Sequence, residues 1–359
     1  MAIKINSLQG ISAMSANGTN RHLRVNPRLI RNPLRNIDHK FQGTYAGYIT
    51  GTRVPPGVGS VGYFEKFLFA SDASSTNVGS LMTSSRRTLC SVGQSSETSG
   101  YTAGGYISPN IYSNVIDKFP FATDFGATDV GDLTLARFGA AGQSSNVSGY
   151  ASGGYSATPP VPSRFRTTID KFPFATNANA TDVGNLSVAR HVGGSQSSEV
   201  SGYTSGGYRV PQASPVINSF QSNVIDKFPF ATNANATDVG DMTLLFTFSA
   251  GASSTVSGYN SGGVGRSGTP FPYIGRNIIE KFPFATDANA TDVGDLTVAR
   301  QRAAGVTSTD SGYSLGGSPA PVDGGLTSFI DKFPFATDAN ATDVGDLSGE
   351  FTSATGLQD

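Results

Sequence analysis

The sequence predicts an all-β fold: a six-bladed β-propeller closed by strands from the N- and C-terminal ends of the chain. Three observations predict it, namely a period of 51 to 56 residues, two signatures that alternate within the period, and incomplete units at the two ends. The repeat fills most of the 359 residues, so we expect one large domain rather than the two or three that length alone would allow.

The first signature is the segment 169–175, Ile-Asp-Lys-Phe-Pro-Phe-Ala, which recurs with small changes to give six copies. Its lysine falls at Lys66, Lys118, Lys171, Lys227, Lys281 and Lys332. The second signature, Ser-Gly-Tyr-x-x-Gly-Gly, is complete around Tyr101, Tyr150, Tyr203, Tyr259 and Tyr313, and a degenerate copy surrounds Tyr48. Such a period divides into four short strands, as in a propeller blade.

The fullest repeat predicts the four strands at 195–200, 202–207, 224–230 and 239–244, from the innermost to the outermost. Phe228 and Phe230 lie two residues apart on one strand face, so both can enter the same interface between blades. Pro229 donates no hydrogen bond, so the third strand should end there. The run 232–237, rich in Asn, should make the turn to the outer strand.

The two ends of the chain predict how the ring closes. The repeat begins at a second strand, near Tyr48, and ends after an outer strand at 343–347 that is followed by a short tail. If the tail supplies the missing innermost strand, the first blade is complete and the ring has no free edge. We therefore expect a propeller over residues 41–359, preceded by a basic extended N-terminal arm over residues 1–40.

The repeat resembles the kelch unit, in which a Gly-Gly doublet ends the second strand and a Gly-Asp-Leu-type segment and an Arg follow the third. The matching residues are Gly206 and Gly207, the strand 224–226, the segment 183–186 and Arg190. The chain departs from that pattern because it has no Trp, carries Phe246 in place of one Arg, and lacks the Gly doublet in its first repeat. The departures leave the fold in place and weaken the transfer of any particular kelch function.

The nearly identical segments 281–296 and 332–347 also resemble the repeat proteins of marine bacteriophages, many of which are virion components. That resemblance implies a protein that is assembled in the host cytoplasm and localised in the virion.

An acid directly precedes the lysine in every copy of the first signature. These acids are Glu65, Asp117, Asp170, Asp226, Glu280 and Asp331. Neighbours on a strand point to opposite faces, so each lysine could meet the acid of the next blade in a six-membered ring of ion pairs. Alternatively, the charges lie solvated on the rim, where each pair contributes about 0–1 kcal/mol.

No combination of residues indicates an enzyme, a metal or a cofactor. The chain has three histidines, His22, His39 and His191, and a single cysteine, Cys90, so neither a histidine cluster nor a cysteine zinc site is expected. The run 287–295 superficially resembles a calcium loop, but it lacks the bidentate Glu, and a hairpin turn is the favoured interpretation. No pair of acids for glycoside cleavage is singled out, so a hydrolase is a third and less favoured class.

Charge and hydropathy disfavour two further classes of partner. Charged residues make up 14% of the chain and its net charge is −1, which provides no long-range field for nucleic acid or an anionic membrane. No apolar run suits a secretion signal or a membrane span, so we expect no membrane insertion.

Variation between repeats concentrates between the second and third strands, for example at 155–166 and 265–276. These loops should share one face of the ring, and Arg and Tyr are common anchors of interfaces. The candidate partner-binding residues of the loops are Arg164, Arg166, Tyr208, Arg209, Tyr273 and Arg276. The alternative is that the loops vary because they are exposed and unconstrained.

The N-terminal arm carries seven basic residues and one acid, Asp38. Two Asn-Pro pairs disfavour helix, and the aliphatic residues among the basic ones exceed what a purely solvated tail needs. We expect an extended arm that docks onto a protein partner; a disordered tail and nucleic-acid contact are the alternatives. The candidate partner-binding residues of the arm are Arg21, Arg24, Arg28, Arg31 and Arg35.

Together these features predict a non-catalytic structural protein of a phage virion, such as a tail, nozzle, fibre-attached or capsid-surface component. The arm would bind other virion structural proteins, and the propeller would present its loops. The alternative is a carbohydrate-binding propeller that attaches to a glycan or receptor on the host surface.

Overall fold

The computed structural model describes residues 13–14, 20–21, 41–53, 61–80, 91–108, 111–124, 126–157, 164–209, 220–266, 273–319 and 325–359. The chain divides into two units, Met1–Asp38 and His39–Asp359. In the first unit, β1 (Ala13–Met14) pairs with the antiparallel strand β2 (Asn20–Arg21). The rest of the predicted arm lies outside the described residues.

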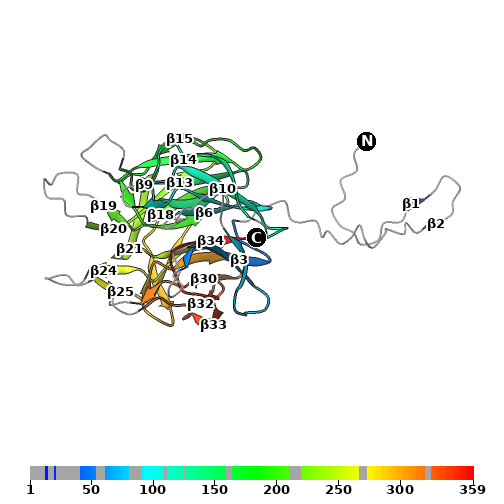
Figure 1. Cartoon of the computed structure of the whole chain (residues 1–359). Helices are drawn as coiled ribbons and strands as arrows, with labels where there is room; N and C mark the ends of the chain where they lie inside the picture. The colour runs from blue at the N-terminus through cyan, green and yellow to red at the C-terminus, as the bar shows by residue number, and fades with distance from the viewer. Residues whose placement is uncertain are drawn as a thin grey trace. The chain divides into compact units, whose positions relative to one another are not determined.

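The second unit is a six-bladed β-propeller, which confirms the predicted fold class (Figure 1). Each blade has four antiparallel strands, and in blade 4 two further short strands belong to the same sheet. From the innermost strand outward, the blades are: blade 1, β34 (Phe351–Gln358), β3 (Ala46–Arg53), β4 (Val61–Leu68) and β5 (Thr76–Ser80); blade 2, β6 (Val92–Ser95), β7 (Ser99–Ala103), β10 (Val115–Pro120) and β11 (Thr128–Asp132); blade 3, β12 (Ala141–Ser144), β13 (Ser148–Ser152), β14 (Thr168–Pro173) and β15 (Thr181–Asn185); blade 4, β17 (Gly194–Ser197), β18 (Ser201–Ser205), β20 (Phe220–Pro229) and β21 (Thr237–Phe246); blade 5, β22 (Ala250–Ser253), β23 (Ser257–Ser261), β26 (Ile278–Pro283) and β27 (Thr291–Asp295); blade 6, β29 (Ala304–Thr307), β30 (Ser311–Leu315), β32 (Phe329–Pro334) and β33 (Thr342–Asp346).

Short two-stranded ribbons extend four of the blades. They pair β8 (Tyr106–Ser108) with β9 (Ile111–Tyr112), β16 (Arg190–His191) with β19 (Tyr208–Arg209), β24 (Val264–Arg266) with β25 (Tyr273–Gly275), and β28 (Arg300–Gln301) with β31 (Ser318–Pro319). The described part of the chain has no helix of the length and apolarity that a membrane crossing requires.

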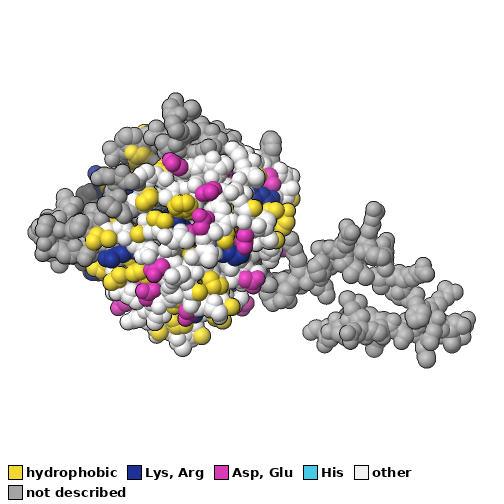
Figure 2. Space-filling view, turned by 90° about the horizontal axis from the view of Figure 1, so that it is seen from below, with side chains coloured by type: hydrophobic (Ala, Val, Ile, Leu, Met, Phe, Trp, Pro, Cys, Tyr) yellow, Lys and Arg dark blue, Asp and Glu magenta, His cyan; other side chains and the backbone are white. Residues whose placement is uncertain are grey.

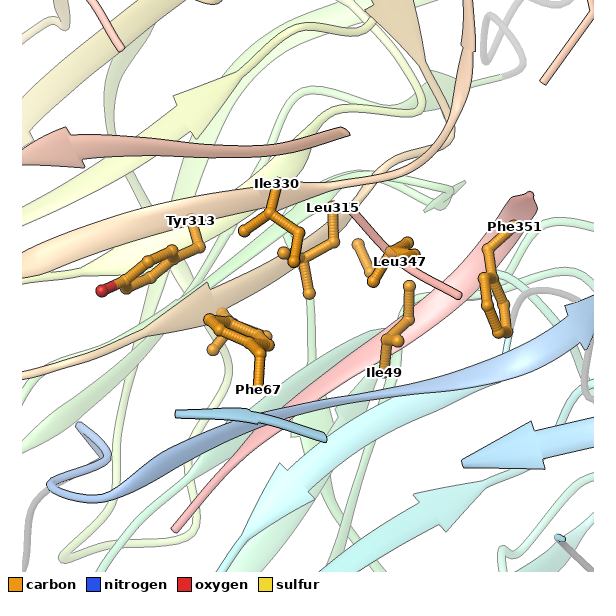
Figure 3. Packing of buried hydrophobic residues seen from close by; sticks show 9 residues of the cluster. Ile49, Phe67, Tyr313, Leu315, Ile330, Leu347 and Phe351 are labelled. Carbon is orange, nitrogen blue, oxygen red and sulfur yellow. The ribbon is translucent and has the colours of Figure 1, made fainter. Parts of the chain in front are cut away.

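The ring closes in blade 1 as the sequence predicted. The C-terminal strand β34 is the innermost strand of that blade and pairs with β3 from Gly47–Gln358 to Arg53–Phe351. At the resulting interface, Tyr313, Leu315 and Ile330 of blade 6 face Ile49 and Phe67 of blade 1 (Figure 3). Both ends of the propeller sequence are therefore held in one sheet, and the closed ring has no free edge.

The two signatures of the repeat meet between adjacent blades. The tyrosine of one blade stacks on the second phenylalanine of the next; in the pair Tyr101–Phe174, for example, the ring centroids are 4.8 Å apart. The six pairs are Tyr48–Phe121, Tyr101–Phe174, Tyr150–Phe230, Tyr203–Phe284, Tyr259–Phe335 and Tyr313–Phe69. A Cβ atom on Gly202, the glycine before Tyr203, would overlap with the ring of Phe228. The Ser-Gly-Tyr motif thus leaves room for the first phenylalanine of its own blade.

The six innermost strands approach one another closely around the axis. A Cβ atom on Gly305 would clash with the carbonyl oxygen of Gly251, the equivalent residue of the preceding blade, and Gly142, Gly251, Gly356 and Gly93 stand in the same relation to their neighbours. Ser195 takes the sixth position. At the end of the central channel where the innermost strands end, backbone N–H groups donate to side-chain hydroxyls of the next blade. The N–H of Ser144, for example, donates to the Oγ of Ser197 at 3.0 Å.

The blades are also joined by ion pairs, but the predicted partners are wrong. The strand acids Asp170, Asp226 and Asp331 pair with Arg137, Arg190 and Arg300 of the preceding blade at 3.1, 2.7 and 3.0 Å. The strand acid does not pair with the lysine of the preceding blade, because its carboxylate accepts hydrogen bonds from residues that follow the outermost strand of that blade. Thr134, for example, donates to Asp170 from its backbone N–H at 2.9 Å.

Four lysines pair instead with an aspartate in the turn between the third and fourth strands of the next blade. These pairs are Lys66–Asp124, Lys227–Asp287, Lys281–Asp338 and Lys332–Asp72. The arginine pairs are buried, whereas the lysine pairs are partly exposed. On the side of the disc seen in Figure 2, the coloured acidic and basic side chains are interspersed with apolar ones.

Candidate functional site

The propeller has two ends, which carry different loops and turns. The connections between blades and the segments between second and third strands lie at the end where the innermost strands begin, which we call the loop face. The turns between first and second strands lie at the opposite end, which we call the arm face. Figure 1 shows β19, β20, β24 and β25 at one end of the propeller and the C-terminus toward the other.

The chain enters the propeller at the arm face. Phe41 lines a cavity of about 50 Å³ together with Ser144, Ser197 and Thr307, which are the last residues of innermost strands. Gln42 Nε2 donates to the carbonyl oxygens of Ser253 and Ser308 at 3.2 Å each. Phe41 and Gln42 are buried, so these contacts fix the point at which residues 1–40 join the ring.

Three equivalent turns of the arm face expose aliphatic side chains. Val147, Val200 and Val256 are 67%, 68% and 65% exposed, and the equivalent residues of blades 2 and 6 are Thr98 and Asp310. Their backbone carbonyls accept hydrogen bonds from phenylalanine N–H groups, as Val147 does from Phe174 at 2.9 Å. The backbone of each turn therefore stabilises the fold, whereas folding does not require the exposed valine side chain.

The loop face carries a continuous series of aromatic rings. From blade 2 to the connection between blades 4 and 5, successive ring centroids lie 5.3 to 6.0 Å apart. We call this series the aromatic arc, with members Tyr106, Phe138, Tyr155, His191, Tyr208 and Phe248, beside which Tyr112 and Phe165 pack. All eight rings are partly exposed.

The arc arises from three positions of the repeat, one after the Gly-Gly doublet and two neighbouring positions in the connections between blades. Tyr106, Tyr155 and Tyr208 each follow a Gly-Gly doublet whose positive φ angles, such as 65° and 98° at Gly206 and Gly207, turn the chain out of the second strand. Phe138, His191 and Phe248 come from the connections between blades. In the other repeats Val264 and Ser318 follow the doublet, so the arc covers only one side of the loop face.

His191 contributes an uncharged ring to the arc. Burial among Phe138, Tyr155, Phe165 and Tyr208 lowers its pKa to about 4, although a backbone hydrogen bond with Tyr208 opposes this shift. At neutral pH the imidazole is therefore neutral.

The predicted loop residues occupy different places on this face. Arg164 is exposed and donates to the hydroxyl of Tyr155 at 3.1 Å, and Tyr208 is a member of the arc. Arg166 and Arg209 flank the buried Arg190: the carbonyl of Arg166 accepts from the Arg190 N–H at 3.2 Å, and Arg209 pairs with Arg190 across β16 and β19. Arg276 lies beside Gly265 in blade 5.

The other predicted residues lie wholly or partly outside the described residues. The side chain of Tyr273, whose backbone begins β25, lies outside the described residues. In the arm, Arg21 belongs to β2 with an undescribed side chain, and Arg24, Arg28, Arg31 and Arg35 lie outside the described residues.

Sequence reasoning did not single out Arg302 or any member of the arc other than Tyr208. The guanidinium of Arg302 lies 4.8 Å from the ring centroid of Phe248. Both residues line a cavity of about 90 Å³ at the loop-face end of the central channel, with Ser249 and Ser353. The available signal was that Phe248 and Arg302 take the position of Gly139 and Ser353 in other repeats.

The described residues contain no group of three or more His, Cys, Asp or Glu side chains that could hold a metal ion. The described residues that line the channel cavities are mainly Gly, Ala and Ser, and none of them is a carboxylate. The geometry suits binding by shape, stacking and hydrogen bonds.

A scan of the chain against models of protein families found no match, and a search of curated proteins found no significant match.

Proposed function

We propose that this protein is a non-catalytic assembly protein whose arm face is anchored to a protein partner while its loop face points away. A phage virion is the proposed setting, as a tail, nozzle, fibre-attached or capsid-surface component. That setting rests on the resemblance of the repeat to kelch units and to the repeat proteins of marine bacteriophages.

The observation that carries the proposal is the position of Phe41 and Gln42 at the arm-face end of the channel. Because residues 1–40 continue from this end, a partner that holds them is brought to the arm face. The loops lie at the opposite end and stay free. A single chain can in this way separate anchoring from presentation.

The exposed valines support a protein partner at the arm face. Val147, Val200 and Val256 occupy adjacent blades, and burying an exposed valine against a partner contributes on the order of 1 kcal/mol or more. The row extends the anchoring surface beyond the arm itself.

Incorporation into the parent particle tests the proposal. Deletion of residues 1–36 should leave a folded ring and abolish incorporation, and the triple change Val147→Ser, Val200→Ser and Val256→Ser should weaken incorporation. Thr98→Ser, in the equivalent turn of blade 2, is the matched control and should behave as the wild type. Unchanged incorporation of the deletion variant would refute the anchoring role.

A second candidate function is a carbohydrate-binding propeller for attachment to a host receptor. The aromatic arc favours it, because partly exposed rings held at fixed spacing offer apolar faces to the C–H groups of sugar rings. Glycan binding by the protein outside the particle would support this candidate.

A further inference from the structure

We propose that the aromatic arc and Arg302 form a binding site for an acidic glycan, with Arg302 recognising the carboxylate of one sugar. The inference rests on the second candidate function and assigns that site its ligand class.

The arc supplies the stacking part of the site. A pyranose ring presents C–H groups on its faces and hydroxyls at its edge, so it suits a surface that mixes aromatic faces with polar tips. Tyr106, Tyr155 and Tyr208 carry such tips, and Arg164 already donates to the hydroxyl of Tyr155. The rings also pack against one another, as Tyr208 does against Phe248 at 5.9 Å, so little side-chain freedom is lost on binding.

Arg302 supplies the charged part of the site. Its Nε atom is buried and makes no hydrogen bond within the described structure, while its guanidinium lies over Phe248 at the end of the arc. A carboxylate would accept from the two terminal nitrogens together, a bidentate geometry that guanidinium groups favour. Ser249 and Ser353, which line the same cavity, can bond to sugar hydroxyls.

Charge on the loop face agrees with an acidic ligand. Arg164, Arg209 and Arg276 lie on this face beside or beyond the arc, in addition to Arg302. Of the acids at this end of the ring, Asp132, Asp241, Asp295 and Asp346 lie on the outermost strands, at the rim, and Glu350 lies in the connection from blade 6 to blade 1, on the side that the arc does not cover. A glycan that follows the arc toward the channel therefore meets positive charge.

The ring geometry favours a glycan over single-stranded nucleic acid. Successive bases stack on exposed parallel ring faces, whereas several rings of the arc meet at steep angles, such as 75° between Tyr106 and Phe138 and 80° between Tyr208 and Phe248. Such a surface presents alternating faces and edges, which suits the puckered face of a pyranose better than a row of flat bases.

The test measures binding of the full-length protein to three probes. They are oligogalacturonate, the same oligosaccharide with its carboxylates methyl-esterified, and a single-stranded oligonucleotide. We expect oligogalacturonate to bind at least tenfold more tightly than its ester. Arg302→Gln should remove that preference, Tyr208→Leu and Tyr106→Leu should each weaken both sugars, and Glu350→Gln, as a matched loop-face control, should change neither. Thermal melting of each variant establishes that it is folded.

The other outcomes separate the two levels of the proposal. If acid and ester bind equally and Arg302→Gln has no effect, the role of Arg302 is wrong while carbohydrate binding stands. If neither these probes nor a broad array of acidic and neutral glycans binds, both the acidic-glycan site and the carbohydrate-binding candidate fall. Tighter binding of the oligonucleotide, lost in the same variants, would make the arc a nucleic-acid surface and overturn the inference.

Discussion

Removal of the positive charge at Arg190 tests how the blades are held together. Arg190 is buried between blades 3 and 4, where it donates to the carbonyl oxygens of Thr204 and Val224 at 2.9 Å each and pairs with Asp226 at 2.7 Å. Arg190→Met leaves all three acceptors without that donor. Breaking a buried pair from one side costs about 3–5 kcal/mol, because the remaining charge stays buried and unpaired.

The magnitude is best measured as a double-mutant cycle by chemical unfolding of Arg190→Met, Asp226→Asn and the double variant. We expect the double variant to lose less than the sum of the single changes, by 2 kcal/mol or more on the order-of-magnitude scale for coupled buried groups. The pair Lys227–Asp287, whose side chains are 29% and 58% exposed, is the matched control and should couple by at most about 1 kcal/mol. Equal coupling in the two cycles would refute the distinction between buried arginine pairs and rim lysine pairs, and coupling between Lys171 and Asp226 would refute the corrected partners.

Three further predictions concern the axis and two titratable groups. Gly305→Ala should destabilise the protein by about 2 kcal/mol or more, because its Cβ would clash with the carbonyl oxygen of Gly251. Ser195→Ala, at the equivalent position, should change stability by less than about 1 kcal/mol in thermal melts. Similar effects of the two changes would contradict the close packing of the innermost strands. Burial raises the pKa of Glu280, whose Oε2 has no hydrogen-bond partner, so its contribution to stability should fall as pH rises through the folded-state pKa. Glu280→Gln should therefore be at least as stable as the wild type at pH 8. A marked loss of stability in that variant would contradict the raised pKa. Burial lowers the pKa of His191 to about 4, against 6.5 in the unfolded chain, so stability should decline by at most about 3 kcal/mol as pH falls from 6.5 toward 4. His191→Phe should remove that part of the pH dependence. An identical pH profile in the variant would contradict the burial of a neutral ring.

The repeat signatures predicted the fold because each signature residue has a role in every interface. Tyr203 and Phe284 recur at fixed offsets, and their stacking at 4.7 Å is repeated between all six pairs of blades. The third strand of blade 4 ends at Pro229 as expected, since proline cannot continue the ladder, although the strand begins earlier, at Phe220. Local pattern and ring closure were therefore accessible from the sequence.

The partners in the ion pairs were predicted incorrectly because they depend on how far one blade is shifted against the next along the strand direction. The alternation of side chains along a strand does not define that shift. A signal was present nevertheless. The turn position is Asp in four repeats and Asn177 or Asn233 in the other two, and the four lysines that form rim pairs are those facing an Asp. Lys118 and Lys171, which precede the Asn repeats, lie over Tyr101 and Tyr150 of their own blades.

The aromatic arc was not predictable as a unit because its rings come from segments that only blade packing brings together. Comparison of repeats after the Gly-Gly doublet could have grouped Tyr106, Tyr155 and Tyr208. The residues between them, Phe138 and His191, come from connections whose course depends on how each blade meets the next. Arg302 becomes a candidate only when its position over Phe248 is known.

A reconstruction of the parent assembly, at a resolution that separates the two ends of the ring, tests the central claim most directly. The account predicts a disc with six sectors whose arm face, where Phe41 enters, lies against the partner, with the loop face and its aromatic arc open to solvent. A disc that buries its loop face against the partner, or one with a different number of sectors, would contradict it.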